Sequence, residues 1–253
     1  PEGSSQTYKA DPFWGNDNTV YFENYDYKTL KGDLNSIVFQ HGNWSNEQVL
    51  RQDNTHYSYP FYLEDDGKQY IVPENFQANK LQIHEIESGK IIASKTILEG
   101  RWIDPTLIKH NDKWWLFACP QLNSNEDLYL FYADNLNSEF KAHPLNPVKI
   151  DICSARPGGT PYIDSKSRLI RPSQNSAKTY GASIVLNEII ELNEHKYKEQ
   201  KVDEIFPCSS SKYNQALHTF TYRGDQILID GKRVTFIFDS FWSQLKRKIK
   251  RIL

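Results

Sequence analysis

The sequence predicts an all-β protein: a five-bladed β-propeller with a short C-terminal amphipathic helix. A phrase made of an X-Pro pair, an apolar run, a turn and an aromatic-rich run recurs four times, and the intervals between the prolines are 48, 45 and 52 residues. The copies begin at Asp11-Pro12, Tyr59-Pro60, Asp104-Pro105 and Arg156-Pro157. A period of this length, filled with strand-like segments, is typical of a propeller with one blade per repeat. The alternative is an all-β sandwich of unrelated hairpins.

The first two repeats each contain four strand-like segments, rich in β-branched and aromatic residues. In the first repeat we expect strands at residues 12–14, 19–23, 31–39 and 44–50. In the second we expect them at residues 59–63, 69–72, 81–86 and 91–97. The turn between the first two of these contains Asp66-Gly67, a strong hairpin signal.

The later repeats are less regular. The third predicts strands at residues 105–108, 113–117 and 127–133, and residues 143–148 cross to the next blade. The fourth begins at Pro157, with a second strand at residues 167–171 and a continuation over 182–192. A degenerate fifth copy follows at residues 217–222 and 226–230, and residues 234–238 close the set. We therefore expect one propeller domain over residues 1–240.

Composition narrows the class of protein. A net charge of −2 gives no reason to expect nucleic acid as a partner. Cys119, Cys153 and Cys208 are isolated, which argues against a disulfide framework or a zinc site and favours a reducing, cytoplasmic location. No run of 18 apolar residues and no signal peptide are present. Because the chain opens on Pro1 and lacks methionine, we expect that its native start is missing.

The last stretch, residues 241–253, predicts a basic amphipathic helix. Its apolar residues, counted from Phe238, fall at helical spacing, and five basic residues fill the other face. Such a helix either lies on an anionic membrane surface or packs on the propeller with its basic face in water. Both interpretations stay open, so the predicted location is cytoplasmic with membrane association as an option.

Repeat register predicts which side chains converge. If the first strand of each blade lines the axis, the X residues meet at one mouth of the channel, together with the residues that end the second strands: Glu23, Glu74, Cys119, Arg171 and Asp230. We expect this mouth to gather Asp11, Tyr59, Glu74, Asp104, Arg156, Arg171 and His218. His56, Gln174 and Tyr180 are expected nearby on loops.

These residue types suit carbohydrate chemistry. Asp11, Glu74 and Asp104 are the predicted catalytic carboxylates, since glycosidic-bond chemistry needs an acid and a base or nucleophile. Substrate-binding roles are predicted for Arg156 and Arg171, which suit an anionic group, and for Gln174, His56 and His218; Tyr59 and Trp102 suit stacking on sugars. The alternatives are purely structural roles: aspartates before proline can cap turns, and Arg156 can neutralise a neighbouring aspartate. No cofactor is expected, and no metal, because the seven histidines lack ligand spacing.

Several phrases carry a family resemblance over residues 8–240. They are Asp11-Pro12-Phe13, Ser58-Tyr59-Pro60, Val72-Pro73-Glu74, Asp104-Pro105, His143-Pro144-Leu145-Asn146-Pro147, Ala155-Arg156-Pro157-Gly158 and Arg171-Pro172-Ser173-Gln174. In this order they resemble the N-terminal propeller domain of plant glucosamine inositolphosphorylceramide transferases. Similar domains occur in bacterial proteins of surface-glycan synthesis, alone or fused to transferases.

More distantly, the chain is similar to the five-bladed propellers of family-43 glycoside hydrolases. That resemblance implies a base at Asp11 and a pKa-tuning aspartate at Asp104. Where that family carries its acid, a fourth-blade glutamate, this chain has Ala155-Arg156-Pro157. Glu74, from another blade, is our own candidate for a substitute acid.

The resulting expectation is a carbohydrate-active propeller in surface polysaccharide or glycolipid biosynthesis, which binds or transfers a sugar bearing an anionic group at the channel mouth. Two alternatives stay open: a non-catalytic glycan-binding or scaffolding module for a partner transferase, and a family-43-like hydrolase with a displaced acid. The expected partners are a glycan or sugar phosphate, a glycosyltransferase and an anionic membrane surface, with no nucleic acid.

Overall fold

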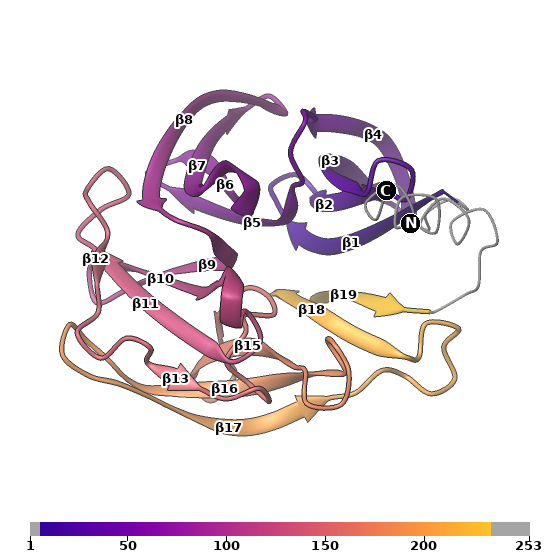
Figure 1. Ribbon diagram of the computed structural model, residues 1–253. Coiled ribbons are helices and arrows are strands. Elements are labelled where there is room, and N and C mark those ends of the chain that lie inside the picture. The colour runs from indigo at the N-terminus through magenta and orange to yellow at the C-terminus, as the bar shows by residue number, and fades with distance from the viewer. Residues whose placement is uncertain (1–5, 234–253) are drawn as a thin grey trace, which may run out of the picture.

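The computed structural model describes residues 6–233, which form five antiparallel sheets around a central axis (Figure 1). The first blade consists of β1 (Thr7–Trp14), β2 (Thr19–Asp26), β3 (Lys31–Gln40) and β4 (Asn43–Arg51). The second consists of β5 (Ser58–Asp65), β6 (Lys68–Glu74), β7 (Lys80–Glu87) and β8 (Lys90–Glu99). In both blades the strands follow chain order from the innermost to the edge, as the repeat predicts.

The third and fourth blades contain strands that the sequence pattern did not predict clearly. Strands β9 (Trp102–His110), β10 (Lys113–Pro120) and β11 (Asp127–Ala133) pair in order, and the short strands β12 (Lys141–Ala142) and β13 (Lys149–Ile150) both pair with β11. The fourth blade has β14 (Tyr162–Ile163), β15 (Leu169–Asn175), β16 (Ser183–Leu192) and β17 (Tyr197–Ile205). β17 was not predicted, because its alternating charged residues give little apolar signal.

The fifth sheet has only two strands, β18 (Ala216–Arg223) and β19 (Gln226–Lys232). The prediction of five four-stranded blades is therefore wrong for residues 6–233, which form four complete blades and one hairpin. After β17, a loop occupies the chain as far as residue 215, and this leaves room for one hairpin before residue 233. The predicted closing strand (residues 234–238) and the predicted C-terminal helix (residues 241–253) lie outside the described residues.

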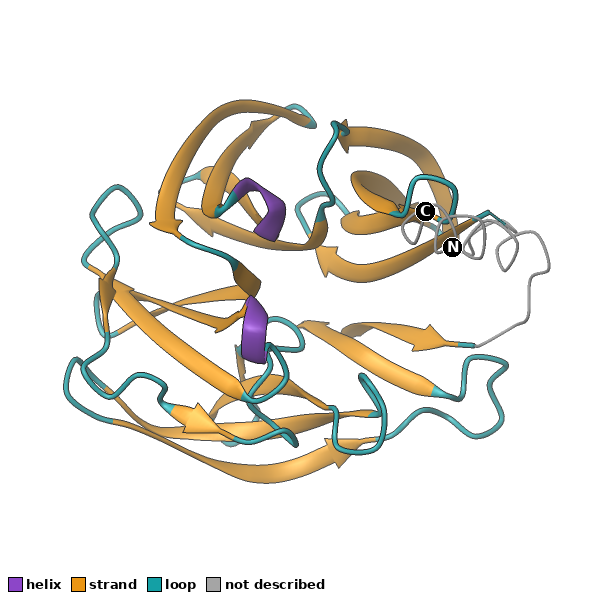
Figure 2. Cartoon of the chain, viewed as in Figure 1, coloured by secondary structure: helices purple, strands orange, loops and turns teal. Residues whose placement is uncertain are grey.

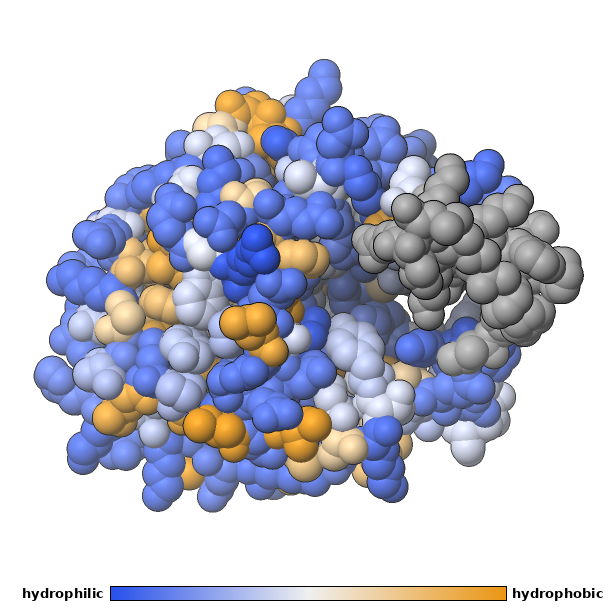
Figure 3. Space-filling model, in the orientation of Figure 1, coloured by the Kyte–Doolittle hydropathy of each residue, from blue (hydrophilic) through white to orange (hydrophobic). Residues whose placement is uncertain are grey.

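The described residues contain no α-helix. Figure 2 shows two short 3₁₀ turns, η1 (Phe76–Ala78) and η2 (Gln121–Asn123), each following the second strand of a blade. Over residues 6–233, no helix is long and apolar enough to cross a membrane. The face seen in Figure 3 is mainly hydrophilic, with scattered hydrophobic side chains.

The β18–β19 hairpin fills the space between the fourth and first blades. Phe220 donates its N–H to the carbonyl of Gly158 at 2.8 Å, and Arg223 donates to the carbonyl of Gly15 at 2.9 Å. Gly159 has φ +139°, and a Cβ built there would lie 1.7 Å from the Phe220 carbonyl oxygen. Only glycine allows this approach of two backbones.

Each X-Pro pair in the first three blades forms a bulge in the innermost strand. Asp11, Tyr59 and Asp104 have φ values of 51°, 45° and 49°, and the pairing with the second strand shifts at each of them. The following proline has no N–H, so it forfeits no ladder hydrogen bond at a bulge. Side chains with φ above zero are strained, and such strain persists where surrounding contacts hold it.

The predicted position of the X residues needs a correction. Asp11, Tyr59 and Asp104 lie inside the innermost strands rather than at their first residues, because pairing continues on both sides of each bulge. Arg156 lies in a loop, immediately before an isolated bridge at Pro157. The repeat therefore marks the point where the innermost strand bends, not where it begins.

Candidate functional site

A cavity of about 910 Å³ lies beside these bulges. Its lining includes five carboxylate side chains: Asp11, Glu23, Glu74, Asp104 and Asp230. Its basic and imidazole groups are Lys9, His56, Arg156, His218, Lys232 and Arg233, and its aromatic groups include Tyr8, Tyr25, Tyr27, Trp44, Tyr180 and Tyr213. Six of the nine residues predicted for the site line this cavity: Asp11, Glu74, Asp104, Arg156, His218 and His56.

Carboxylates from one sheet hold the bulges of the next. The bulge amide of Asp11 donates to Asp230 Oδ2 at 3.1 Å, that of Tyr59 to Asp11 Oδ2 at 3.3 Å, and that of Asp104 to Glu74 Oε2 at 3.3 Å. These amides are buried, and a buried N–H needs an acceptor. The carboxylates of the cavity therefore also join neighbouring blades, a structural role that differs from the capping of local turns.

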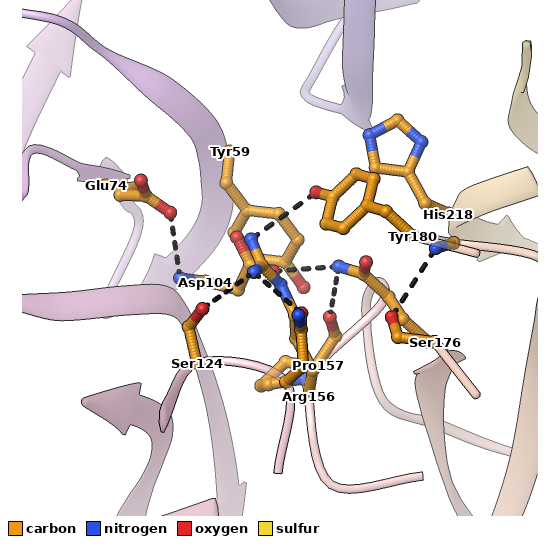
Figure 4. Close-up of polar contacts among 12 residues, drawn as sticks. Tyr59, Glu74, Asp104, Ser124, Arg156, Pro157, Ser176, Tyr180 and His218 are labelled. Atoms are coloured by element: carbon orange, nitrogen blue, oxygen red, sulfur yellow. Dashed lines mark hydrogen bonds and ion pairs between the residues drawn. The ribbon is translucent and has the colours of Figure 1, made fainter. Parts of the chain in front are cut away.

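Asp104 and Arg156 form the centre of a hydrogen-bond network (Figure 4). Asp104 Oδ2 accepts from Arg156 Nε at 2.7 Å and from Gln174 Nε2 at 2.8 Å. The other guanidinium nitrogens donate to Ser124 Oγ at 3.3 Å, Asn125 Oδ1 at 3.2 Å and the Tyr180 hydroxyl at 3.3 Å. All three guanidinium nitrogens of Arg156 therefore have hydrogen-bond partners, and its charge is paired with Asp104.

His218 lies between two aspartates. Its Nε2 is 3.3 Å from Asp11 Oδ1, and its Nδ1 is 3.0 Å from Asp230 Oδ2. Burial alone would lower the pKa of His218, but the charges of Asp230 and Asp11 outweigh burial and raise this pKa to about 9. Burial raises the pKa of Asp11 to about 6, although His218 pulls it down. A protonated imidazole that bridges the two carboxylates satisfies both distances.

The same three residues have the geometry of a cation site. One ligand atom from each of Asp11, His218 and Asp230 lies within 4.8 Å of the others. The sequence gave no such signal, because these residues are far apart in the chain. The carboxylate oxygens already accept from Thr219 Oγ1 and from the amides of Asp11, His218 and Thr219. The hydrogen bonds of a protonated His218 account for the cluster without a metal.

Two other carboxyl groups have no cation of their own. Burial first, and then the charge of Asp104, raises the pKa of Glu74 well above its ordinary value, although Arg156 opposes this. Burial and four neighbouring carboxylates raise the pKa of Glu23 well above its ordinary value. Both groups are expected to be protonated well above the pH at which exposed glutamates ionise.

His56 lines the cavity as a neutral imidazole. Its Nδ1 accepts the Gly32 N–H at 2.8 Å, and burial lowers the pKa of the ring. The same Nδ1 lies 3.8 Å from Glu23 Oε1. Because its lone pair is used by Gly32, Nδ1 carries no proton to give to Glu23, and the proton is on Nε2.

Four residues that the sequence assigned to the site or to sugar stacking do not line the cavity: Tyr59, Gln174, Trp102 and Arg171. Tyr59 is fully buried, and its hydroxyl accepts the Gly159 N–H at 2.8 Å and lies 2.9 Å from Thr106 Oγ1. Gln174 contacts the lining residues through Asp104 Oδ2, which accepts from its side chain, and through the Arg156 carbonyl, which accepts from its amide. Trp102, suggested for stacking, packs instead against Tyr129 and Phe131.

Arg171 was predicted to bind substrate, but it lies away from the cavity. Its fully buried guanidinium binds both carboxylate oxygens of Glu199, at 2.6 and 2.8 Å, and the carbonyls of Ser154 and Ala155. Successive strand residues point to opposite faces, so Arg171 and Gln174, three apart on β15, point in opposite directions. The prediction that Arg171 reaches the cavity was wrong, because its guanidinium is bound by Glu199 and two backbone carbonyls away from the lining; Arg156 does line the cavity.

Sequence reasoning placed Glu23 and Asp230 at the ends of second strands but left them out of the predicted site. It did not find Tyr8, Tyr25 and Tyr27, whose rings form a cluster with centroids 4.7–5.8 Å apart. The alternation of aromatic residues on the paired strands β1 and β2 was the available signal. Thr219, which donates to Asp11 at 2.6 Å, had no signal because it belongs to the fifth copy of the repeat, which has no proline.

The sheets around one axis define a β-propeller, and solved structures share this fold. A solved thermostable family-43 glycoside hydrolase matches with a TM-score of 0.58 and 11% identity over 79% of this chain and 75% of its own. The catalytic domain of the Coprinopsis cinerea GH62 α-L-arabinofuranosidase matches with a TM-score of 0.60 and 14% identity, over 95% and 90%. Identities this low establish the shared fold alone.

The chain belongs to the family described as Glucosamine inositolphosphorylceramide transferase 1, N-terminal, whose sequence profile matches residues 2–226. It is 27% identical over 214 residues to Glucosamine inositolphosphorylceramide transferase 1 of Oryza sativa subsp. japonica, covering 79% of this chain and 29% of that protein. The Arabidopsis thaliana protein of the same name is 26% identical over 256 residues, covering 92% and 33%. The chain therefore spans about a third of the length of these relatives, and the resemblance seen in its motifs is confirmed.

Proposed function

We propose that this propeller binds a sugar bearing an anionic group in its axial cavity and serves surface polysaccharide or glycolipid biosynthesis. The observation that carries the proposal is the composition of the cavity. Carboxylates that accept hydroxyl hydrogens lie beside aromatic rings and basic side chains in a space of about 910 Å³. Sites for small polar ligands combine such convergent polar groups with aromatic walls.

The aromatic walls come from two sides of the cavity. Tyr8 and Tyr25 stack with their centroids 4.7 Å apart on the first blade. Tyr180 lies 5.3 Å from the His218 ring, between the fourth blade and the hairpin. A sugar ring between these walls has apolar faces to cover and hydroxyls for the carboxylates.

The anionic group fits the basic part of the lining better than it fits Arg156. Lys232 and Arg233 belong to the lining, and the Lys232 ammonium lies 6.0 Å from the Tyr180 ring centroid. The charge of Arg156 is matched by Asp104. We therefore assign the carboxylate or phosphate of the ligand to Lys232 and Arg233, and the neutral hydroxyls to Asp11 and Asp104.

Binding is favoured over hydrolysis of the family-43 kind. The position that the resemblance gives to the catalytic acid holds Arg156, whose side chain pairs with Asp104. An arginine stays protonated at physiological pH and cannot donate a proton to a departing oxygen. We propose that the chain holds a glycan for a glycosyltransferase, as the N-terminal position of the matching family in longer transferases suggests.

Calorimetric titration with a panel of ligands tests the proposal. The panel contains methyl β-D-glucuronide, myo-inositol 1-phosphate, glucosamine and, as a neutral control, methyl β-D-glucoside; the cyclitol phosphate and the amine are suggested by the names of the relatives. We expect an anionic member to bind and Lys232→Ala to weaken it. Asp65→Asn, on the salt bridge between Asp65 and Lys109 outside the cavity, is the matched control. If no member binds, the proposed function is wrong.

Glycosidic-bond cleavage is a second candidate, favoured by the environment of Glu74. Burial and Asp104 raise its pKa, as a proton donor requires. Release of nitrophenol from nitrophenyl glycosides is the readout. Turnover that Glu74→Gln abolishes, while the variant keeps its unfolding temperature, would favour this candidate. Binding without turnover favours the first.

A further inference from the structure

Glu23 differs from the other cavity carboxylates in its hydrogen bonding. It lies on β2 opposite Ala10, lines the cavity and is 4% exposed. Its Oε1 is buried and has no hydrogen-bond partner within residues 6–233. A Cβ at Gly32 would lie 2.4 Å from this oxygen, so the fold makes room for a carboxyl group there. A buried ionised oxygen without a partner is strongly unfavourable.

Comparison with the second repeat shows why Glu23 does not accept a bulge amide. Glu23 and Glu74 occupy the same register, each opposite the residue that precedes a bulge. Glu74 accepts the bulge amide of the next blade, from Asp104. The corresponding amide next to Glu23 is that of Tyr59, and Asp11 accepts it instead. The first blade therefore has one more carboxyl group than its bulge contacts use.

The charges around Glu23 are predominantly negative. Asp11 faces it from β1, Glu74 from β6, Asp104 from β9 and Asp230 from β19, and Tyr8 is a further neighbour from β1. Among residues 6–233, the basic group within 4 Å of the Glu23 carboxyl is His56, whose Nδ1 already accepts from the Gly32 amide. Arg156 and His218 are taken by the aspartates that they bind. A proton is the counter-charge that remains for Glu23.

We propose that Glu23 is a specificity-determining residue: a neutral carboxyl that donates a hydrogen bond to an ether oxygen of the bound sugar, either the ring oxygen or the glycosidic oxygen. The inference rests on the proposed sugar-binding function. An ether oxygen can only accept, so the ionised carboxylates of the cavity repel it and a protonated carboxyl matches it. Hydroxyl groups, which donate, fall to Asp11 and Asp104. Glu23 thus distinguishes a pyranoside from a cyclitol, which has no ether oxygen.

Binding of methyl β-D-glucuronide by wild type, Glu23→Gln and Glu23→Ala between pH 5.5 and 9 is the test. The amide of the Gln variant donates a hydrogen bond at every pH, and we expect its affinity to lack the Glu23 component of the pH dependence. The wild type should lose about tenfold per pH unit once Glu23 ionises, and the Ala variant should bind at least about tenfold more weakly than the wild type at pH 5.5. Asp11 and His218 also titrate, and they do so in all three proteins.

Three results would overturn the inference. One is an Ala variant that binds like the wild type, another is a Gln variant with the wild-type pH profile, and the third is a panel in which only myo-inositol 1-phosphate binds. Carbon-13 NMR of the glutamate side chains, with Glu23 assigned from the Gln variant, measures its ionisation without any ligand. A Glu23 carboxyl that is ionised at pH 5.5 also contradicts the inference. If no panel sugar binds while NMR shows a neutral Glu23, the proposed sugar-binding function is wrong. The donor role of Glu23, which rests on that function, is then wrong as well.

Discussion

Arg156 Nε lies 2.7 Å from Asp104 Oδ2, and this ion pair joins a loop of the fourth blade to the bulge of the third. In the neighbouring bond, the Asp104 amide donates to Glu74. One cation therefore influences two carboxyl groups from two blades. Because Arg156 opposes the rise in the pKa of Glu74, its removal should favour the protonated form of Glu74 further.

We expect Arg156→Ala to destabilise the protein by about 3 kcal/mol, since it leaves a buried carboxylate unpaired. The pKa of Glu74 should rise further, because the opposing positive charge is lost. Urea unfolding measures the first effect and carboxyl NMR the second. Arg168→Ala, which breaks a more exposed pair with Asp164, is the control and should cost less than about 1 kcal/mol.

Stability should fall as pH rises past neutrality because of His218. The pKa of His218 is raised in the folded state to about 9, above its ordinary value of 6.5, so the folded protein binds the proton more tightly than the unfolded chain does. The stabilisation, about 3 kcal/mol, is fully present below pH 6.5 and is lost as pH rises through 9. His218→Gln should show a flatter stability curve over this range in urea titrations. A wild-type curve that is equally flat would show that the two aspartates do not hold a proton on His218.

At acid pH the ion pair between Arg171 and Glu199 should stop stabilising the fold. The pKa of Glu199 is lowered to about 2: burial opposes this, but Arg171 and Lys149 outweigh it. Its stabilisation is present above pH 4.5 and is lost as pH falls towards 2. Arg171→Met should destabilise the fold by about 3–5 kcal/mol at pH 7, because Glu199 keeps its buried charge. Sugar affinity of the folded fraction should stay unchanged, whereas a direct role of Arg171 in binding predicts its loss.

Tyr59→Phe should destabilise the fold by about 1–3 kcal/mol, because the Gly159 amide loses its acceptor in a buried place. Tyr62→Phe removes a hydroxyl whose partner, Glu64, is exposed, and it is the matched control. Differential scanning calorimetry of the two variants measures this difference as a difference in melting temperature. Equal melting temperatures would mean that the Tyr59 hydroxyl is not an acceptor that the fold depends on.

For residues 241–253 the membrane prediction stays as the sequence made it. We expect the full chain to sediment with liposomes that contain anionic lipid, since each basic residue near such a surface contributes roughly 1 kcal/mol. A chain that ends at residue 240 should not sediment, and salt should weaken the attachment of the full chain. Equal sedimentation of both forms would leave the helix with a packing role only.

The sequence allowed much of the fold to be predicted, because a strict local signal repeats. An X residue before proline marks the bulge of the innermost strand in the first three blades, and two of these bulges place Asp11 and Asp104 in the lining of one cavity. Arg171 was misplaced because its partner, Glu199, is 28 residues further along on a strand without apolar alternation. Glu23 was undervalued because its character depends on Asp11 taking the Tyr59 amide, which no spacing reveals.

The bond from the Asp11 amide to Asp230 spans 219 residues, and it has a consequence for the order of assembly. Within the propeller, β1 waits for the β18–β19 hairpin before the ring can close. Long-range closure of this kind is slow, because chain entropy is lost before the contact forms. Until then His218 and Asp230 are absent from the cavity, so a nascent chain displays four blades and no finished ligand site. Sugar binding would accordingly report that the propeller has closed, and nascent chains stalled before residue 216 should fail to bind.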